Sequence, residues 1–242
     1  MDSTSASSRS PWWSTGVLDR ELNTLYSAYA AGRPSSLPDL PIQYSDFSGW
    51  QRQRFTGEAL GAQLSYWKRQ LDGMPPVLEL PADRPRPALP TYRGGSYRLA
   101  MRRKLREGLE ALGRHAGATP FMTLLAAFQT FLHRYTGQTD LVVGTPIANR
   151  TRPETEGMIG FFANTLVMRT DLANHPSFTE VLGRVRPMAI AAYAHQDLPF
   201  EKLVEELHPE RNYSLNPLFQ VMFVFQNEAD IASTDPASGL TV

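Results

Sequence analysis

The chain of 242 residues contains no cysteine, which excludes disulfides, thiolate metal sites and cysteine nucleophiles. It has no net charge either, because 24 Lys and Arg balance 24 Asp and Glu. Without an overall basic field, a protein has no general attraction to nucleic acid or to an anionic membrane. No apolar run approaches the roughly 20 residues that span a bilayer. We therefore expect a cytoplasmic protein with no nucleic-acid or membrane partner.

The N-terminal residues 1–12 are rich in serine and have no apolar core, which excludes a secretory signal peptide. We expect a disordered tail there. A helix follows over residues 13–32, because Leu18, Leu22 and Leu25 recur at helical spacing. Ser14 is the expected cap of this helix, and Gly32 is expected to end it.

Residues 33–95 are predicted to form a proline-rich connector that contains two helices, over 44–54 and 58–71. Six prolines between residues 75 and 90 predict an extended linker. The main boundary of the chain is placed there.

Residues 96–242 alternate between helical and strand patterns, which predicts an α/β fold built as a two-layer sandwich. Thr119 and Ser177 are expected to cap two of the helices, the second in a capping box with Glu180. Pro187 predicts a kink in that second helix. The expected strands cover residues 96–101, 140–147, 162–169 and 218–226.

Four sequence blocks, in this order, resemble the condensation domain of nonribosomal peptide synthetases. They are the blocks Tyr44–Trp50 (YSDFSGW), Ile159–Arg169 (IGFFANTLVMR), His195–Glu201 (HQDLPFE) and Arg211–Leu218 (RNYSLNPL). The segments LPADRPRP at 80–87 and VGTPIANR at 143–150 are also similar to the family. Together the blocks cover about residues 13–242, and their shared order makes the resemblance far more specific than any single block.

This resemblance implies a fold like that of chloramphenicol acetyltransferase, used twice as two lobes around a tunnel. It also implies a donor acyl group and an acceptor amine, each on the phosphopantetheine arm of a carrier protein, with no cofactor bound covalently to this chain. By this comparison the chain holds the last helix of the first lobe (13–32), the connector (33–95) and most of the second lobe (96–242). A final strand and helix of the family would follow Gly239–Val242.

The family's catalytic motif, His-His-x-x-x-Asp-Gly, would stand directly before Trp13. Ala6 and Ser7 occupy the places of the two histidines, and Pro11 and Trp12 those of Asp-Gly. None of these side chains can accept a proton near neutral pH. We therefore assign no catalytic residue to this chain and expect a fragment that is inactive alone.

Gly160 and Asn164 are the strongest candidates for the substrate tunnel. A glycine lets backbone or ligand approach closely, and an amide offers both a donor and an acceptor to a pantetheine amide. The alternative interpretation is a turn glycine and an asparagine bonded to the sheet edge.

His195 and Gln196 are weaker tunnel candidates. His195 has no nucleophile motif beside it, so a structural role is the alternative. Asp197 and Pro199 are expected to be structural, with Asp197 as the N-cap of the next helix. The other histidines lack metal-ligand spacing, so we expect no metal site.

Asp46 and Trp50 are expected to form a packed joint between lobes, with Asp46 bonded to backbone or to arginine. Arg150 and Arg152 are candidates for contact with an acidic carrier protein, although a solvated loop is the alternative. The basic run at 102–106 leaves the same two interpretations open.

Three functions are compatible with the sequence. The chain is a fragment of an amide-forming condensation domain, a non-catalytic module that docks a carrier protein or complements a separate first lobe, or a stand-alone acetyltransferase of the related fold. The third would need a histidine motif of its own, and none is found in this sequence. If the helix at Leu18 and Leu22 lacks a covering sheet, we also expect self-association.

Overall fold

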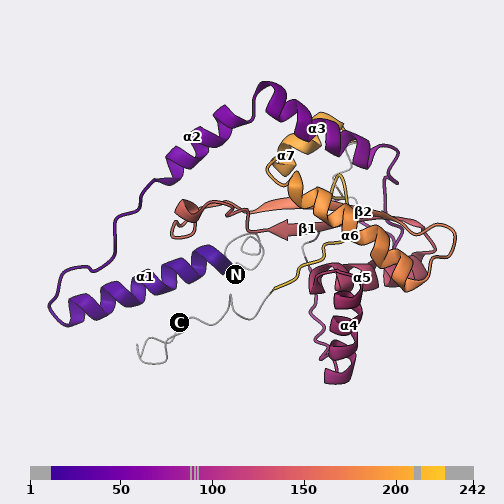
Figure 1. The fold of residues 1–242 in the computed structure, drawn as a ribbon, viewed down its shortest axis with the longest axis horizontal. Helices are drawn as coiled ribbons and strands as arrows, with labels where there is room; N and C mark the ends of the chain where they lie inside the picture. The colour runs from indigo at the N-terminus through magenta and orange to yellow at the C-terminus, as the bar shows by residue number, and fades with distance from the viewer. Residues whose placement is uncertain (1–11, 88, 90, 92, 210–213, 227–242) are drawn as a thin grey trace. The chain divides into compact units, whose positions relative to one another are not determined.

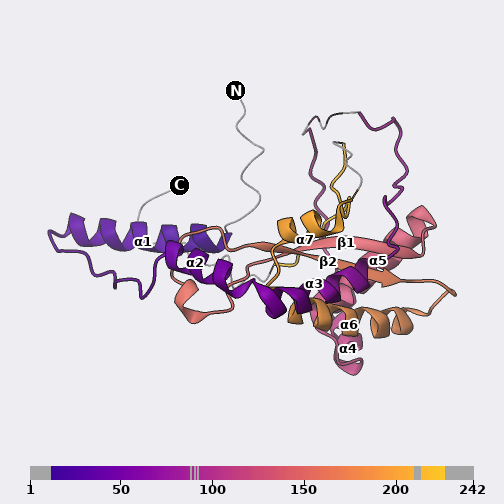
Figure 2. The same cartoon turned by 90° about the horizontal axis from the view of Figure 1, so that it is seen from above.

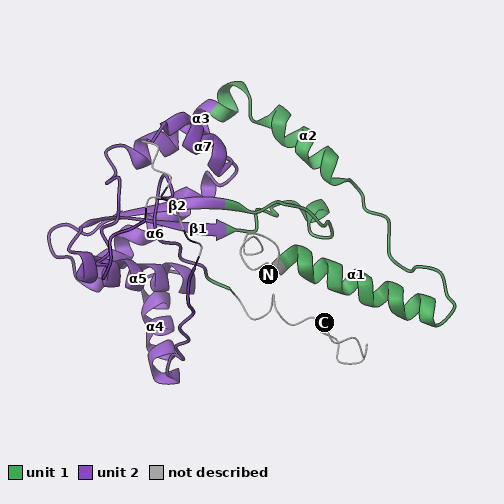
Figure 3. Ribbon diagram, turned by 180° about the vertical axis from the view of Figure 1, so that it is seen from behind, with its two compact units in different colours: residues 1–60, 147–164, 225–242 green, residues 61–146, 165–224 purple. Residues whose placement is uncertain are grey.

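The computed structural model describes residues 12–87, 89, 91, 93–209 and 214–226 (Figure 1). The chain divides into two compact units (Figure 3). Unit 1 takes residues from 1–60, 147–164 and 225–242, and unit 2 comprises 61–146 and 165–224. The expected tail at 1–11, block residues 211–213 and Gly239–Val242 lie outside the described residues. The domain bounds drawn from sequence stay a prediction.

Unit 1 contains helix α1 (Trp12–Ala30), helix α2 (Tyr44–Arg54), the 3-10 turn η2 (Pro153–Thr155) and the start of helix α3 (Gly57–Leu71). Gly32 takes a positive φ of 64° just beyond α1, as expected of the residue that ends the helix. Leu18 and Leu22 on α1 are 50% and 49% exposed. The predicted apolar face of this helix is therefore open in the described structure.

Helix α2 has the bounds that the sequence predicted. A capping box fixes its start: the backbone N–H of Gln43 donates to Asp46 Oδ2 at 2.8 Å. Asp46 is thus bonded to backbone, one of the two partners expected for it. Its carboxylate also lies in the first turn, where the helix dipole favours negative charge.

Unit 2 is built from most of α3 and from four further helices and two strands (Figures 1 and 2). The helices are α4 (Arg103–His115), α5 (Pro120–Thr136), α6 (Phe178–Ala194) and α7 (Phe200–Leu207), and the strands are β1 (Asp140–Ile147) and β2 (Asn164–Asp171). Thr119 accepts a hydrogen bond from Met122 N, and Ser177 forms the expected capping box with Glu180. Both predicted caps are confirmed.

The core of unit 2 lies where α5 and α6 pack beside the two hydrogen-bonded strands. In Figures 1 and 2, α6 runs along one face of the strands. Consecutive residues of both strands are buried, which is the pattern of strands covered on both faces. The largest contributors are fully buried aliphatic side chains, among them Leu125, Leu141, Leu166, Met168 and Leu182.

A third extended segment lies parallel to β1. Gly144 N donates to the Val221 carbonyl at 3.0 Å, and Phe223 N donates to the Gly144 carbonyl at 2.8 Å. A Cβ on Gly144 would lie 2.4 Å from the Phe219 ring, so only glycine fits beside this buried aromatic.

Arg169 on β2 connects the sheet to the end of α3. Its guanidinium donates to the Asp140 carboxylate, at 2.7 Å for the closest pair, and to the carbonyls of Gln70 and Asp72 at 3.1 and 2.6 Å. The hydrogen bond to Asp140 raises the pKa of Arg169 above its ordinary value, because it stabilises the charged form. One side chain thus satisfies two carbonyls at the end of a helix.

Three expectations about local structure are wrong. Residues 96–101 form no strand: Tyr97 and Leu99 are 90% and 84% exposed, and no ladder pairs this segment in the described structure. The second strand is shifted two residues toward the C-terminus, to 164–171. Residues 218–226 make a single bridge to β1 instead of a strand, because they run at its side with few ladder bonds.

The predicted cap positions of two helices are also wrong. Ser14 lies inside the first turn of α1, which begins at Trp12, so its hydroxyl is free to bond elsewhere. Pro199, and not Asp197, is the N-cap residue of α7. Helix α6 continues through Pro187, whose ring nitrogen cannot donate to the preceding turn.

The observed mixture of packed helices and a small sheet is α/β, as predicted. Among residues 12–226, within the described ranges, no helix combines the length and apolarity that crossing a membrane requires.

Candidate functional site

The loop before β2, residues 156–163, is the most constrained part of unit 1. The N–H of Gly160 donates to Ser14 Oγ at 3.3 Å, and that hydroxyl donates to the Gly160 carbonyl at 3.0 Å. A Cβ on Gly160 would lie 2.5 Å from the Tyr44 ring, whose hydroxyl donates to the Phe161 carbonyl at 2.9 Å. The glycine therefore allows close approach, and the group that approaches is Tyr44. A place for Gly160 on a substrate tunnel stays a prediction.

Arg150 lies at the centre of this loop. Its guanidinium donates to Ser14 Oγ at 2.9 Å and to the Thr155 carbonyl. The same group is 4.2 Å from the centroid of Phe162 and 5.8 Å from that of Trp13, both within cation–π range. Desolvation lowers the pKa of Arg150 from its ordinary value. The side chain is engaged inside unit 1.

Arg152 differs from Arg150 in its exposure. Arg152 is exposed, and its guanidinium lies 4.1 Å from the Trp50 ring centroid. This stacking holds the charge at the surface without consuming its hydrogen-bond donors. The predicted carrier-protein contact of both arginines is untested, and the geometry favours Arg152 for it.

An aromatic cluster packs against the loop. Phe47 of α2 lies with Met158 and Phe162 in a buried group, against which Trp50 also packs. The rings of Phe47 and Phe162 are 4.7 Å apart between centroids and tilted by 59°. Asp46 and Trp50 are therefore structural in unit 1, while their role between lobes stays a prediction.

Asn164 follows this loop as the first residue of β2 and is 9% exposed. It is thus at the boundary between the constrained loop and the buried strand. Gly160 and Asn164 fall in unit 1, whereas His195 and Gln196 fall in unit 2. A shared tunnel for the four residues remains a prediction.

His195 lies at the C-terminal end of α6 in unit 2. Its Nδ1 is 2.8 Å from the Ala191 carbonyl, and because a carbonyl only accepts, Nδ1 carries the proton. The imidazole stacks on Tyr66 with centroids 3.8 Å apart and planes 8° apart. The His195 carbonyl accepts from Trp67 Nε1 at 3.0 Å. These contacts support the structural interpretation of His195.

Tyr66 is a residue that the sequence did not single out. Its hydroxyl is buried and has no hydrogen-bond partner among the described residues. Burial raises the pKa of Tyr66 to about 12. A buried hydroxyl of this kind leaves no signal in sequence, since it depends on the helix that covers it.

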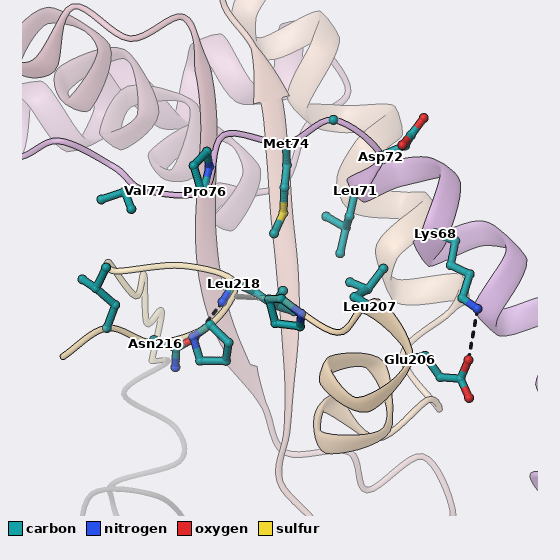
Figure 4. Close-up of a pocket in the computed structure, with 14 residues that line it drawn as sticks. Lys68, Leu71, Asp72, Met74, Pro76, Val77, Glu206, Leu207, Asn216 and Leu218 are labelled. Carbon is teal, nitrogen blue, oxygen red and sulfur yellow. Dashed lines mark hydrogen bonds and ion pairs between the residues drawn. The ribbon is translucent and has the colours of Figure 1, made fainter. Parts of the chain in front are cut away.

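A cavity of about 610 Å³ opens between the end of α3 and the end of α7 in unit 2 (Figure 4). Its wall is mostly aliphatic, with Leu71, Met74, Val77, Leu207 and Leu218 among the lining residues. Lys68 and Glu206, 3.0 Å apart, form an ion pair at the cavity. A volume of this size suits a small organic ligand or an apolar side chain. Sequence reasoning did not find it, because its lining comes from three distant segments.

The described residues contain no group of His, Asp and Glu side chains that could hold a metal ion. The basic run at 102–106 lies at the start of α4. Arg103 and Arg106 there pair with Glu107 and Glu110 along the helix, at 2.7 and 3.7 Å. These exposed pairs fit a solvated face as well as a docking patch.

Comparison with known proteins agrees with the sequence blocks. The family model of the condensation domain matches residues 12–240, and the chain therefore belongs to the condensation-domain family. The resemblance to nonribosomal peptide synthetases is confirmed, and with it the fold class.

The similar proteins are long synthetases and separate condensation-like domains. A linear gramicidin synthase polypeptide of Brevibacillus parabrevis is 60% identical over 215 residues, which are 89% of this chain and 4% of that protein. The X-domain from teicoplanin biosynthesis is 33% identical with a TM-score of 0.82, over 88% of this chain and 48% of that one. Its complex with OxyB gives 34% identity and a TM-score of 0.81, over 87% and 47%. The chain thus spans a small part of the synthase and about half of the X-domain.

Proposed function

We propose that this chain supplies the second lobe of an amide-forming condensation domain and that it needs a first lobe to act. In the proposed reaction an acceptor amine attacks a donor aminoacyl or peptidyl thioester, the amide bond forms, and the thiol of the donor carrier's phosphopantetheine arm leaves. The general base would come from the first lobe, on the same or on a separate polypeptide. The match of the condensation family over residues 12–240 carries this proposal.

The chain's own residues supply no replacement for that base. Ala6 and Ser7 stand where the resemblance places the histidine pair. His195 has its Nδ1 bonded to a backbone carbonyl and its ring stacked on Tyr66, which supports a structural role. A positioned base contributes about 10²–10⁴-fold to such a reaction. We therefore propose that the chain alone forms no detectable amide.

The proposed contribution of the chain is positioning. Holding two tethered substrates in reactive geometry can contribute more than the base itself. Asn164, nearly buried beside a clamped loop, is the proposed hydrogen-bonding group for a pantetheine or substrate amide. Arg152, exposed and stacked on Trp50, is the proposed contact for an acidic carrier protein.

A second candidate function is a docking module without catalysis. The X-domain to which this chain is similar has been solved in complex with OxyB. A condensation-like domain can therefore serve as a binding surface for another protein. For this chain the partner would be a carrier protein or a separate first lobe.

The test uses donor and acceptor carrier proteins loaded with aminoacyl groups, and the intact mass of the acceptor carrier reports the dipeptidyl product. The chain is added alone, with a first lobe, and with a first lobe whose two histidines are replaced by alanine. Product only with the intact first lobe supports the proposal. Product from the chain alone overturns it, and a His195→Ala variant would then show whether that residue is the base. Carrier binding without product in any mixture favours the docking module.

A further inference from the structure

We propose that the Ser14 hydroxyl is a positioning group that couples the first turn of α1 to the loop at 158–163, and through it to Asn164. This inference rests on the proposed function. It assigns a role to a residue that the sequence had marked only as a helix cap.

The hydroxyl of Ser14 uses its whole hydrogen-bonding capacity on one loop. It accepts from Gly160 N at 3.3 Å and from Arg150 Nη2 at 2.9 Å, and it donates to the Gly160 carbonyl at 3.0 Å. A hydroxyl has one donor and two acceptor sites, so none is left over. Ser14 is 8% exposed, which strengthens these bonds because water competes little. A helix whose turn begins at Trp12 does not need this serine for its own backbone.

Arg150 fixes the direction in which the Ser14 hydroxyl points. Its second donor is committed to the Thr155 carbonyl, and its planar face is held between the Trp13 and Phe162 rings. Trp13 adds a bond from its indole N–H to the Glu156 carbonyl at 2.9 Å. Two neighbouring residues of α1 are thus bonded to the same loop. The first turn of the helix and the loop can therefore move only together.

The coupling matters because of what stands at each end. The resemblance places the family's histidine loop directly before Trp13, and Asn164 follows Gly160 by four residues. A rigid link between Ser14 and Gly160 would hold the base and the amide group in one frame. Displacement of a reacting group by about 1 Å can lower a rate by about 100-fold.

The test compares Ser14→Ala with Ser14→Thr, which retains the hydroxyl, and with Thr15→Ala, an exposed neighbour on the same helix. Each variant is assayed with the first lobe and loaded carriers. We expect Ser14→Ala to lower kcat by about 10- to 100-fold with KM for the carriers unchanged. We expect Thr15→Ala to match the unsubstituted chain and Ser14→Thr to recover most of the rate. A Ser14→Ala rate equal to that of Thr15→Ala overturns the inference.

A second readout is independent of catalysis. The Gly160 amide donates to Ser14, so hydrogen exchange of the 157–163 segment should accelerate in Ser14→Ala and in Arg150→Lys, but not in Thr15→Ala. Unchanged exchange in both variants, with the circular dichroism of the folded chain, also overturns the inference. If the unsubstituted chain and first lobe give no product, the proposed function fails. The exchange experiment still decides whether the coupling exists.

Discussion

The two units of this chain are held together by different forces. Unit 2 has a continuous aliphatic core, in which side chains from α5, α6 and both strands are fully buried. Unit 1 has a small aromatic cluster around Phe47 and Phe162, and its loop is fixed by hydrogen bonds to Ser14 and Arg150. Area removed from water stabilises unit 2, whereas directional bonds determine the geometry of unit 1. Substitutions should therefore alter stability in unit 2 and position in unit 1.

The largest expected difference between the units comes from removing one leucine side chain. Leu125 is 0% exposed, so Leu125→Ala should lower the free energy of unfolding by about 2–5 kcal/mol through lost burial and a cavity. Leu18→Ala on α1 is the control, and at 50% exposure it should change stability by about 0.5 kcal/mol or less. Urea unfolding followed by circular dichroism measures both. Equal losses would break the comparison.

A smaller contrast follows from adding a methyl group at two glycines. In unit 2, Gly144→Ala forces a Cβ toward the buried Phe219 ring, which should cost about 1–3 kcal/mol. In unit 1, Gly160→Ala meets Tyr44, which is 40% exposed and can swing outward at the loss of one hydrogen bond, about 1 kcal/mol. Thermal melts of the two variants give the order. A larger loss for Gly160→Ala would mean that the aromatic cluster is as rigid as the core.

Arg169→Lys tests the polar connection inside unit 2. A lysine keeps the charge but cannot reach Asp140, Gln70 and Asp72 with one planar group, so we expect a loss of about 1–2 kcal/mol. Arg103→Lys is the matched control, because its pair with Glu107 is exposed and should contribute almost nothing. Urea unfolding at low and high salt distinguishes the two. Indifference to Arg169→Lys would show that packing alone holds the end of α3.

The smallest expected effect is a change in alkaline stability at Tyr66. Burial raises its pKa from the ordinary 10.0 to about 12, so between these pH values the unfolded chain loses this proton and the folded chain keeps it. The contribution of Tyr66 is complete below pH 10 and is lost as pH rises toward 12. Tyr66→Phe should flatten that part of the Tm–pH curve, while Tyr97→Phe, 90% exposed in the folded chain, should not. Identical curves for the two variants would contradict a buried Tyr66.

Local sequence signals predicted the elements whose ends are fixed by nearby residues. Helix α2 and strand β1 have the expected bounds, and the caps at Thr119 and Ser177 act within three residues of themselves. Residues 96–101 were mistaken for a strand, because alternating apolar residues do not say whether a neighbouring strand is available. The same limit applies to residues 218–226, which reach β1 through one bridge.

The candidate site was predicted in its parts and missed in its connections. Gly160 and Asn164 were found through the family's motif, and the structure shows what holds the glycine. The role of Ser14 could not be read from its neighbours, since its partners lie 136 and 146 residues further along the chain. The stacking of His195 on Tyr66 likewise joins residues that no local pattern relates.

The bond between Ser14 and Gly160 also has a consequence for synthesis. The ribosome makes Ser14 146 residues before the glycine that it binds. At about 5–20 residues per second, the helix waits roughly 7 to 30 seconds for its partner. During that interval the exposed leucines of α1 are open to chaperones and to neighbouring nascent chains. Slow codons between the two residues would lengthen the wait, so the yield of folded chain should depend on translation rate.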